Sequence, residues 1–170
     1  MTRPHPYLTL LAAVLVMGAG VLLGVRMLTS AGEAQVAAPT CTDRAVATGE
    51  PLTPNLVQVN VLNASGREGQ ANRVTINLQR RGFLEGAIAN STSAVEVPNV
   101  TILTSDPEDP RVQLVAQQFV GEIAYAEPDI PVEDGVTVII GDGYQDLNPE
   151  APTEIVSTRD LAICVPIIDL

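Results

Sequence analysis

The residues best placed to bind a ligand form one short loop, Asn63-Ala64-Ser65-Gly66-Arg67-Glu68-Gly69. An alternating apolar segment precedes this loop and a helical pattern follows it, so we expect the loop at the N-terminus of a helix. Free backbone N–H groups and the helix dipole favour an anion there. Arg67 would add a positive charge. The candidate site for a phosphate, a carboxylate or a partner protein therefore comprises Asn63, Ser65, Gly66, Arg67 and Gly69.

The same loop also has a purely structural explanation. Asn63 can cap a turn, and Ser65 can cap the following helix in a capping box with Glu68. The glycines permit positive φ angles and close packing. A serine that caps a helix is already engaged as an acceptor, so we favour the structural explanation over the ligand site.

Other kinds of catalytic or metal site lack the residues they need. The single histidine, His5, lies beside an apolar run near the N-terminus, which leaves no partner for a Ser–His or Cys–His pair in the remainder. Acidic residues gather at 106–109 and 142–150 among turn-forming residues, and neither group has the calcium-loop spacing. We expect a protein that is not an enzyme, with no metal and no cofactor.

The charge and composition argue against two classes of ligand. The chain has a net charge of −11, and its nine basic residues are all arginine. Because nucleic-acid binding depends on clustered cations, we expect no nucleic-acid partner. Aromatic residues make up only 3 % of the chain, which provides poor stacking surfaces for sugars or bases.

The two cysteines, Cys41 and Cys164, lie on either side of the segments that are expected to fold. In an oxidising compartment they would form a disulfide across a very long loop, worth roughly 4–5 kcal/mol in the chain-entropy model. The alternative is a pair of unrelated buried thiols.

An apolar segment near the N-terminus predicts a membrane anchor. Residues 8–25 contain no charge, and Arg26 can extend the span to residue 28 by snorkelling. Because a secretory signal has a shorter apolar region of about 7–15 residues, an uncleaved transmembrane helix is preferred over a removed signal peptide. Arg3 predicts that residues 1–7 are cytoplasmic and that the remainder lies outside the plasma membrane.

The rest of the chain predicts a linker, one small α+β domain and a C-terminal extension. Residues 29–55 have the composition of a flexible linker, and residues 148–170 contain one short strand that returns to the domain. Between them, residues 56–147 give a βαββαβ order, with two helices on one face of a four-stranded sheet. The expected strands are 56–63, 83–88, 95–103 and 136–140.

Helical spacing and capping signals locate the two helices of this domain. The first is expected between Ser65 and Gly82, with Ala71, Val74 and Leu78 on its apolar face. The second begins at Asp109 and Pro110, and its apolar face is formed by Val112, Val115, Ala116, Phe119 and Ile123.

Residues 59–74 and 78–83 resemble the C-terminal domain of the LytR family. They combine a V-x-V-x-N-A-[ST]-G-x-x-G loop with A-x-R-V and with an L-x-x-R-G-F helix end. The resemblance covers about half of the chain and implies an envelope protein of the single-span actinobacterial type, without the transferase domain of LytR-CpsA-Psr proteins. It implies those transferases as partners, and peptidoglycan or a wall glycopolymer as a further partner.

These observations lead to one functional hypothesis and one alternative. We expect a membrane-anchored extracytoplasmic scaffold that supports the attachment of wall glycopolymers to peptidoglycan through protein contacts. The alternative is a non-catalytic module that binds peptidoglycan or a glycopolymer and fastens the membrane to the wall.

Overall fold

The computed structural model of the protein describes Met17, residues 41–132 and residues 134–166. Within these residues, no helix combines the length and the hydropathy that crossing a bilayer would require. The predicted span over 8–28, apart from Met17, and the predicted cytoplasmic segment 1–7 lie outside the described residues. Residues 41–170 form a compact unit separate from residues 1–40, and the description below concerns that unit.

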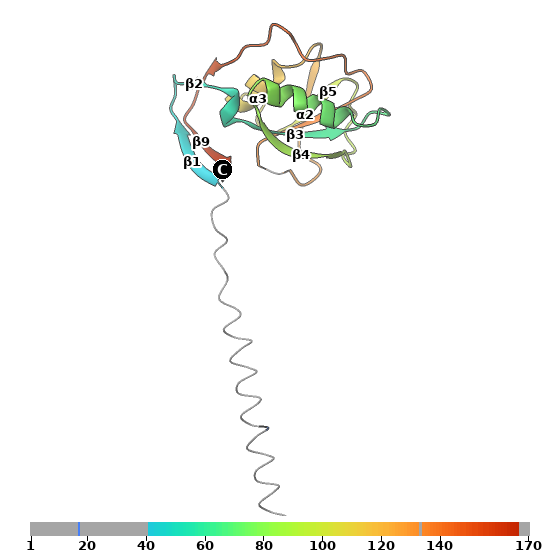
Figure 1. Ribbon diagram of the computed structural model, residues 1–170, viewed down its shortest axis with the longest axis horizontal. Helices are drawn as coiled ribbons and strands as arrows, with labels where there is room; N and C mark the ends of the chain where they lie inside the picture. Colours follow the sequence, from blue (N-terminus) through green and yellow to red (C-terminus); the bar gives the residue numbers. More distant parts are fainter. Residues whose placement is uncertain (1–16, 18–40, 133, 167–170) are drawn as a thin grey trace, which may run out of the picture. The chain divides into compact units, whose positions relative to one another are not determined.

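A mixed sheet of five strands forms the centre of the described part of this unit (Figure 1). The strand order is β4-β3-β7-β5-β6. The bounds of these strands are β3 Gln58–Asn63, β4 Leu84–Asn90, β5 Val100–Leu103, β6 Ile123–Ala126 and β7 Val136–Ile140. Strand β7 is central and fully buried, as expected for its run of apolar and β-branched residues.

The sheet consists of two parallel βαβ units on either side of β7. In the first unit, helix α2 (Gln70–Arg80) connects β3 to the parallel strand β4, and in the second, α3 (Pro110–Ala116) connects β5 to the parallel strand β6. Strand β7 runs parallel to β3 and antiparallel to β5. The topology therefore brings the ends of β3 and β7 side by side.

Both helices cover the same face of the sheet. Val74 and Leu78 of α2, each 1 % exposed, belong to the same buried cluster as Leu114 and Val115 of α3. Alternate residues of β3, β5 and β7 complete this core: Val59, Val61, Val100, Ile102, Val136, Val138 and Ile140. The burial of each such side chain contributes roughly 1.5–3 kcal/mol. The opposite face has a smaller cluster of Leu62, Leu103 and Ile139, covered by loop residues Val95, Val97 and Ile130.

The predicted C-terminus of the first helix is confirmed. Gly82 has a φ of 96°, and its N–H donates to the carbonyl of Gln79, while the N–H of Phe83 donates to the carbonyl of Leu78. These two bonds make a Schellman motif, which requires a residue that tolerates positive φ at Gly82.

The prediction of four strands and a long second helix is wrong. Helix α3 ends at Ala116, and Ile123, which we assigned to its apolar face, begins the additional strand β6. Gly121, with a φ of 88°, lies in the turn between them. Ile123 packs against the main core from β6, and it could do so from a helix as well. The spacing of apolar residues alone therefore does not distinguish a helix from a strand here.

The predicted linker 29–55 contains ordered strands in its second half. Strand β1 (Cys41–Val46) pairs with β9 (Leu161–Pro166), and β2 (Pro51–Leu52) pairs with β8 (Ile155–Val156). A 3-10 helix, η1 (Pro54–Leu56), then leads into β3. Residues 41–55 are therefore part of the folded unit, and the C-terminal extension returns to it through two strands, β8 and β9, where one was predicted.

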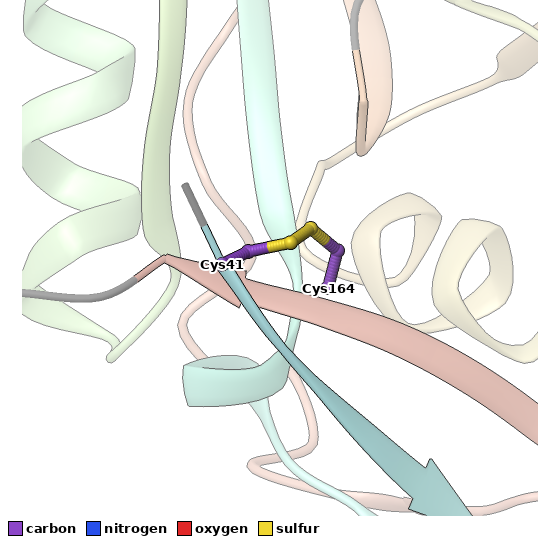
Figure 2. The surroundings of a disulfide bond; sticks show 2 residues. All are labelled: Cys41 and Cys164. Carbon is purple, nitrogen blue, oxygen red and sulfur yellow. A yellow bond between two sulfur atoms is a disulfide. The ribbon is translucent and has the colours of Figure 1, made fainter. Parts of the chain in front are cut away.

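A disulfide joins Cys41 to Cys164 near the end of the β1–β9 pair at which β1 begins and β9 ends (Figure 2). The Cα atoms of the two cysteines lie 5.3 Å apart, and 123 positions separate them in the sequence. This bond confirms the predicted pairing, and the alternative of two separate thiols is wrong.

Candidate functional site

The candidate loop is organised by the side chain of Asn63, the last residue of β3. Its Oδ1 accepts hydrogen bonds from the backbone N–H of Ser65 at 3.1 Å and from the Ser65 hydroxyl at 2.7 Å. Its Nδ2 donates to the carbonyl of Arg67 at 3.0 Å. An asparagine that bonds its own backbone two residues on forms an Asx turn, which confirms the turn-capping role predicted for Asn63.

A carboxylate of the protein itself interacts with this loop. Asp142, in the turn after β7, accepts a hydrogen bond from the backbone N–H of Gly66 at 2.8 Å, and its carbonyl accepts one from Arg67 at 3.0 Å. The parallel pairing of β3 and β7 places Asn63 opposite Ile140 and so brings the two following turns together. An internal anion therefore occupies part of the position that the sequence suggested for a ligand.

Ser65 does not cap the helix, which corrects the predicted capping box. Its Oγ accepts a hydrogen bond from the N–H of Arg67 at 3.2 Å, within the loop. The N-cap of α2 is Gly69, in a left-handed conformation with φ 69°, and the helix begins at Gln70. The capping signal was misread because serine forms the same kind of local bond in a turn as at a helix end.

The five predicted residues do come together around one open surface hollow. It has a volume of about 600 Å³, and Asn90 and Ser91 of the neighbouring chain segment complete its lining. The backbone N–H groups of Ser65, Gly66 and Arg67 are all engaged inside the protein. The hollow is thus lined by amide and hydroxyl side chains, while the backbone N–H groups of residues 65–67 are already bonded within the protein.

Below this loop, the side chain of Gln70 is buried, with 5 % of its surface exposed. Its Oε1 accepts a hydrogen bond from the Ser65 hydroxyl at 3.3 Å, and no residue of the described part of the chain bonds to its Nε2. The buried Gln70 side chain therefore contacts the loop through Ser65.

The first acidic cluster is a structural network. Asp109 caps α3 as predicted, accepting from the N–H of Arg111 at 2.8 Å, and it forms an ion pair with the Arg111 guanidinium at 2.6 Å. Burial raises the pKa of Asp109, but the bonds from Arg111 outweigh burial, and the net pKa lies below its ordinary value. Asp106 pairs with Arg159, which lowers the pKa of Asp106 and ties the β5–α3 loop to the turn before β9.

Within the described ranges, 41–132 and 134–166, no three His, Cys, Asp or Glu side chains are grouped closely enough to hold a metal ion.

Sequence reasoning missed a second hollow, at the C-terminal end of α2. It has a volume of about 360 Å³ and is lined by Arg80, Arg81, Gln118 and a proline-rich segment around Pro149 and Pro152. In the sequence, Arg80 and Arg81 indicate only the basic end of a helix, and nothing places Pro152 beside them.

Comparisons with known proteins place this geometry in a family. The family model for the LytR cell envelope-related transcriptional attenuator matches residues 56–144, which include the candidate loop and all five strands of the central sheet. No curated protein matches the chain. One solved structure that it resembles is the soluble domain of a conserved hypothetical secreted protein from Mycobacterium marinum. The identity is 24 %, the TM-score is 0.45, and the match covers 60 % of this chain and 68 % of that one.

Because the family model spans more than half of the sequence, from the last residue of η1 to the turn that holds Asp142, this chain belongs to the LytR cell envelope-related transcriptional attenuator family.

Proposed function

We propose that this protein is a membrane-anchored, extracytoplasmic accessory module of cell-envelope biogenesis. It supports the attachment of wall glycopolymers to peptidoglycan by contacting the proteins that carry out the transfer, and it catalyses no reaction itself. The observation that carries this proposal is the family match over residues 56–144.

Two further observations support the proposal. The disulfide between Cys41 and Cys164 suits a protein that folds in an oxidising compartment outside the membrane. The candidate loop is held by Asn63 and Asp142 in a fixed shape, which suits a surface that is recognised by a partner. A preformed surface loses little entropy on binding.

The expected anchor over residues 8–28 is part of the proposal, and protease protection tests it. A C-terminal epitope on the full-length protein should be digested when protease is added to intact cells whose outer wall has been made permeable. Protection of the epitope until the membrane is lysed would place the folded unit on the cytoplasmic side and contradict the proposal.

Crosslinking in living cells tests the scaffold function. A photo-reactive residue on the surface of the full-length protein should recover LytR-CpsA-Psr transferases or peptidoglycan-building enzymes, identified by mass spectrometry. If neither class is enriched over an equally abundant, unrelated membrane protein, the scaffold proposal is wrong.

The alternative function is a direct contact with peptidoglycan or a wall glycopolymer. The polar hollow beside Asn90 and Ser91 favours this alternative, since its amide and hydroxyl groups can bond to sugar hydroxyls. Cosedimentation with purified peptidoglycan in the absence of other proteins separates the two functions. A scaffold should stay in the supernatant, whereas a wall-binding module should pellet.

A further inference from the structure

Helix α2 has a basic surface in an otherwise acidic protein. Its residues Gln70–Arg80 include Arg73 and Arg80 but no acid, and Arg81 follows as the C-cap. The whole chain has 20 acidic residues and only nine basic ones. Arg73 and Arg80 are both exposed and lie seven positions apart. Seven residues correspond to about two helical turns, so both arginines lie on one side of α2.

No carboxylate of the protein neutralises these arginines within the described ranges. The ion pairs found there join Arg111 to Asp109 and Arg159 to Asp106. Arg80 instead donates to the side-chain oxygen of Asn77 at 3.3 Å. The charges on α2 are therefore available to an external anion.

An exposed apolar residue lies between the two charges. Ile76 is 40 % exposed, although most large apolar side chains of this unit are buried. It forms part of a hollow of about 320 Å³ together with Gly69, Asn72, Arg73, Asn77 and Arg80. Arg80 also lines the hollow at the end of α2, so its side chain borders both hollows. We call this surface, from Arg73 through Ile76 to Arg81, the arginine groove.

The structure holds Arg81 in place at the end of this groove. Its guanidinium donates to Gln118 Oε1 at 3.0 Å, and Gln118 is only 1 % exposed. The amide of Gln118 is fixed in turn by donating to the carbonyls of Leu114 and Pro152, each at 3.1 Å. A guanidinium has five N–H donors, so most of those of Arg81 remain for a ligand. A fixed guanidinium loses less entropy when it binds a carboxylate.

We propose that the arginine groove binds an acidic, extended segment of a partner protein. One carboxylate contacts Arg73, another contacts Arg80 and Arg81, and the apolar part of the segment between them packs on Ile76. This inference rests on the proposed scaffold function and names the surface and the chemistry through which that function would operate.

The spacing of the arginines defines the partner segment further. At 1.5 Å per residue, Arg73 and Arg80 are separated by roughly 10 Å along the helix axis. In a polyproline II segment, residues three apart lie on the same side at a separation of about 9 Å. A proline-rich segment with an acid at every third position therefore matches the groove. A uniformly charged polymer would leave Ile76 without an apolar contact, so a protein segment fits the observations better.

Binding of a synthetic peptide to the full-length protein in detergent micelles tests the groove. The probe is a fluorescent, proline-rich peptide with glutamate at every third position, and its control has glutamine at those positions. We expect only the acidic peptide to bind. The double variant R73E/R80E should weaken this binding at least about tenfold, because two charge-assisted contacts become repulsive. The neutral variant R73Q/R80Q, which guards against misfolding, should give an intermediate loss.

A matched variant controls for the general effect of charge. Arg44 lies exposed on β1 and lines neither hollow. The variant R44E therefore makes the same kind of charge change at one site away from the groove, and this variant should bind the peptide as the wild type does. Circular dichroism should show the same unfolding midpoint for the wild type and R73Q/R80Q. Equal binding by the glutamine peptide, or unchanged binding by R73E/R80E, would overturn the proposal.

Two further measurements separate this inference from its alternatives. If poly(glycerol phosphate) binds through Arg73 and Arg80 while the acidic peptide does not, the partner is a polyanion and the proposal is wrong. If cellular crosslinking recovers the same envelope proteins from R73E/R80E as from the wild type, the scaffold function stands and the groove proposal fails. If peptide binding depends on the groove but the wild type recovers no envelope protein, the groove stands and the scaffold function fails.

Discussion

Removing the disulfide between Cys41 and Cys164 should destabilise the protein mainly through its unfolded state. With a sequence separation of 123 between the two cysteines, the chain-entropy relation gives about 5 kcal/mol at 25 °C. This is a large share of the roughly 5–15 kcal/mol that stabilises a typical domain.

The native fold should survive the loss of the bond. Strands β1 and β9 remain paired along six residues, and Val46, Leu161 and Ile163 of these strands are buried in the main core. These apolar contacts hold the two strands in place without the covalent link. We therefore expect a loss of about 3–5 kcal/mol in the free energy of unfolding, with a nearly unchanged native circular dichroism spectrum.

Urea denaturation of a fragment spanning residues 41–170 provides the assay, since these residues form one compact unit. The oxidised wild type is compared with the reduced wild type and with the double variant C41S/C164S. The latter two should agree, and both should show a larger m-value because their unfolded chains are less compact. Hydrogen exchange should show an equal loss of protection among the slowest-exchanging amides, because the bond acts on global unfolding. A double variant within about 1 kcal/mol of the oxidised wild type would refute this reasoning.

Three other predictions test local features of the fold. Replacing Gly82 by alanine should lower the free energy of unfolding, measured by thermal unfolding, by about 1–2 kcal/mol because φ is 96° there. Gly66→Ala is the control and should cost less, because φ is ordinary there and the nearest atom lies 3.8 Å from the added carbon. Asp109→Ala should cost about 1–2 kcal/mol by removing both the N-cap and the ion pair with Arg111. Because the folded-state pKa of Asp109 is lowered, its charge contributes fully above the unfolded value near 3.8, and that contribution declines as the pH falls below it. Asp109→Asn should therefore flatten the acid limb of a stability–pH curve, and an unchanged limb would contradict this assignment. Burial raises the pKa of Tyr144 to about 12, with Asp146 adding to the effect, so alkaline titration of tyrosinate absorbance should show a late step that is absent in Tyr144→Phe. Because the folded state favours the neutral form of Tyr144, the free energy of unfolding should be unaffected by this group below about pH 10. It should then fall as the pH rises toward 12.

The local elements of this fold could largely be predicted from the sequence because local physics determines them. The alternating apolar residues of β3, the apolar face of α2, the glycine at its C-terminus and Asp109 as the cap of α3 each depend on neighbours within a few positions. The disulfide was also predictable, since two cysteines on either side of a folded segment in an oxidising compartment have one possible partner each.

Other features were decided only in three dimensions. Ile123 fits the apolar side of a helix or of a strand, and only its pairing with Val100 in the sheet makes it the start of β6. Ser65 can cap a helix or close a turn; in the structure it lies in the turn, where Asp142 accepts a bond from the next residue, Gly66, because β7 pairs with β3.

The same division applies to the surfaces that could bind a partner. The sequence by itself determined which residues carry charge, namely the loop Arg67 and the arginines of α2. Tertiary contacts decided how those side chains are held: Arg67 donates to the backbone carbonyl of Asp142, while the ion pairs among the described residues include neither Arg73 nor Arg80. The physical reason is that the partners of a side chain often lie far away in the sequence. Only the strand order β4-β3-β7-β5-β6 brings such residues close to one another.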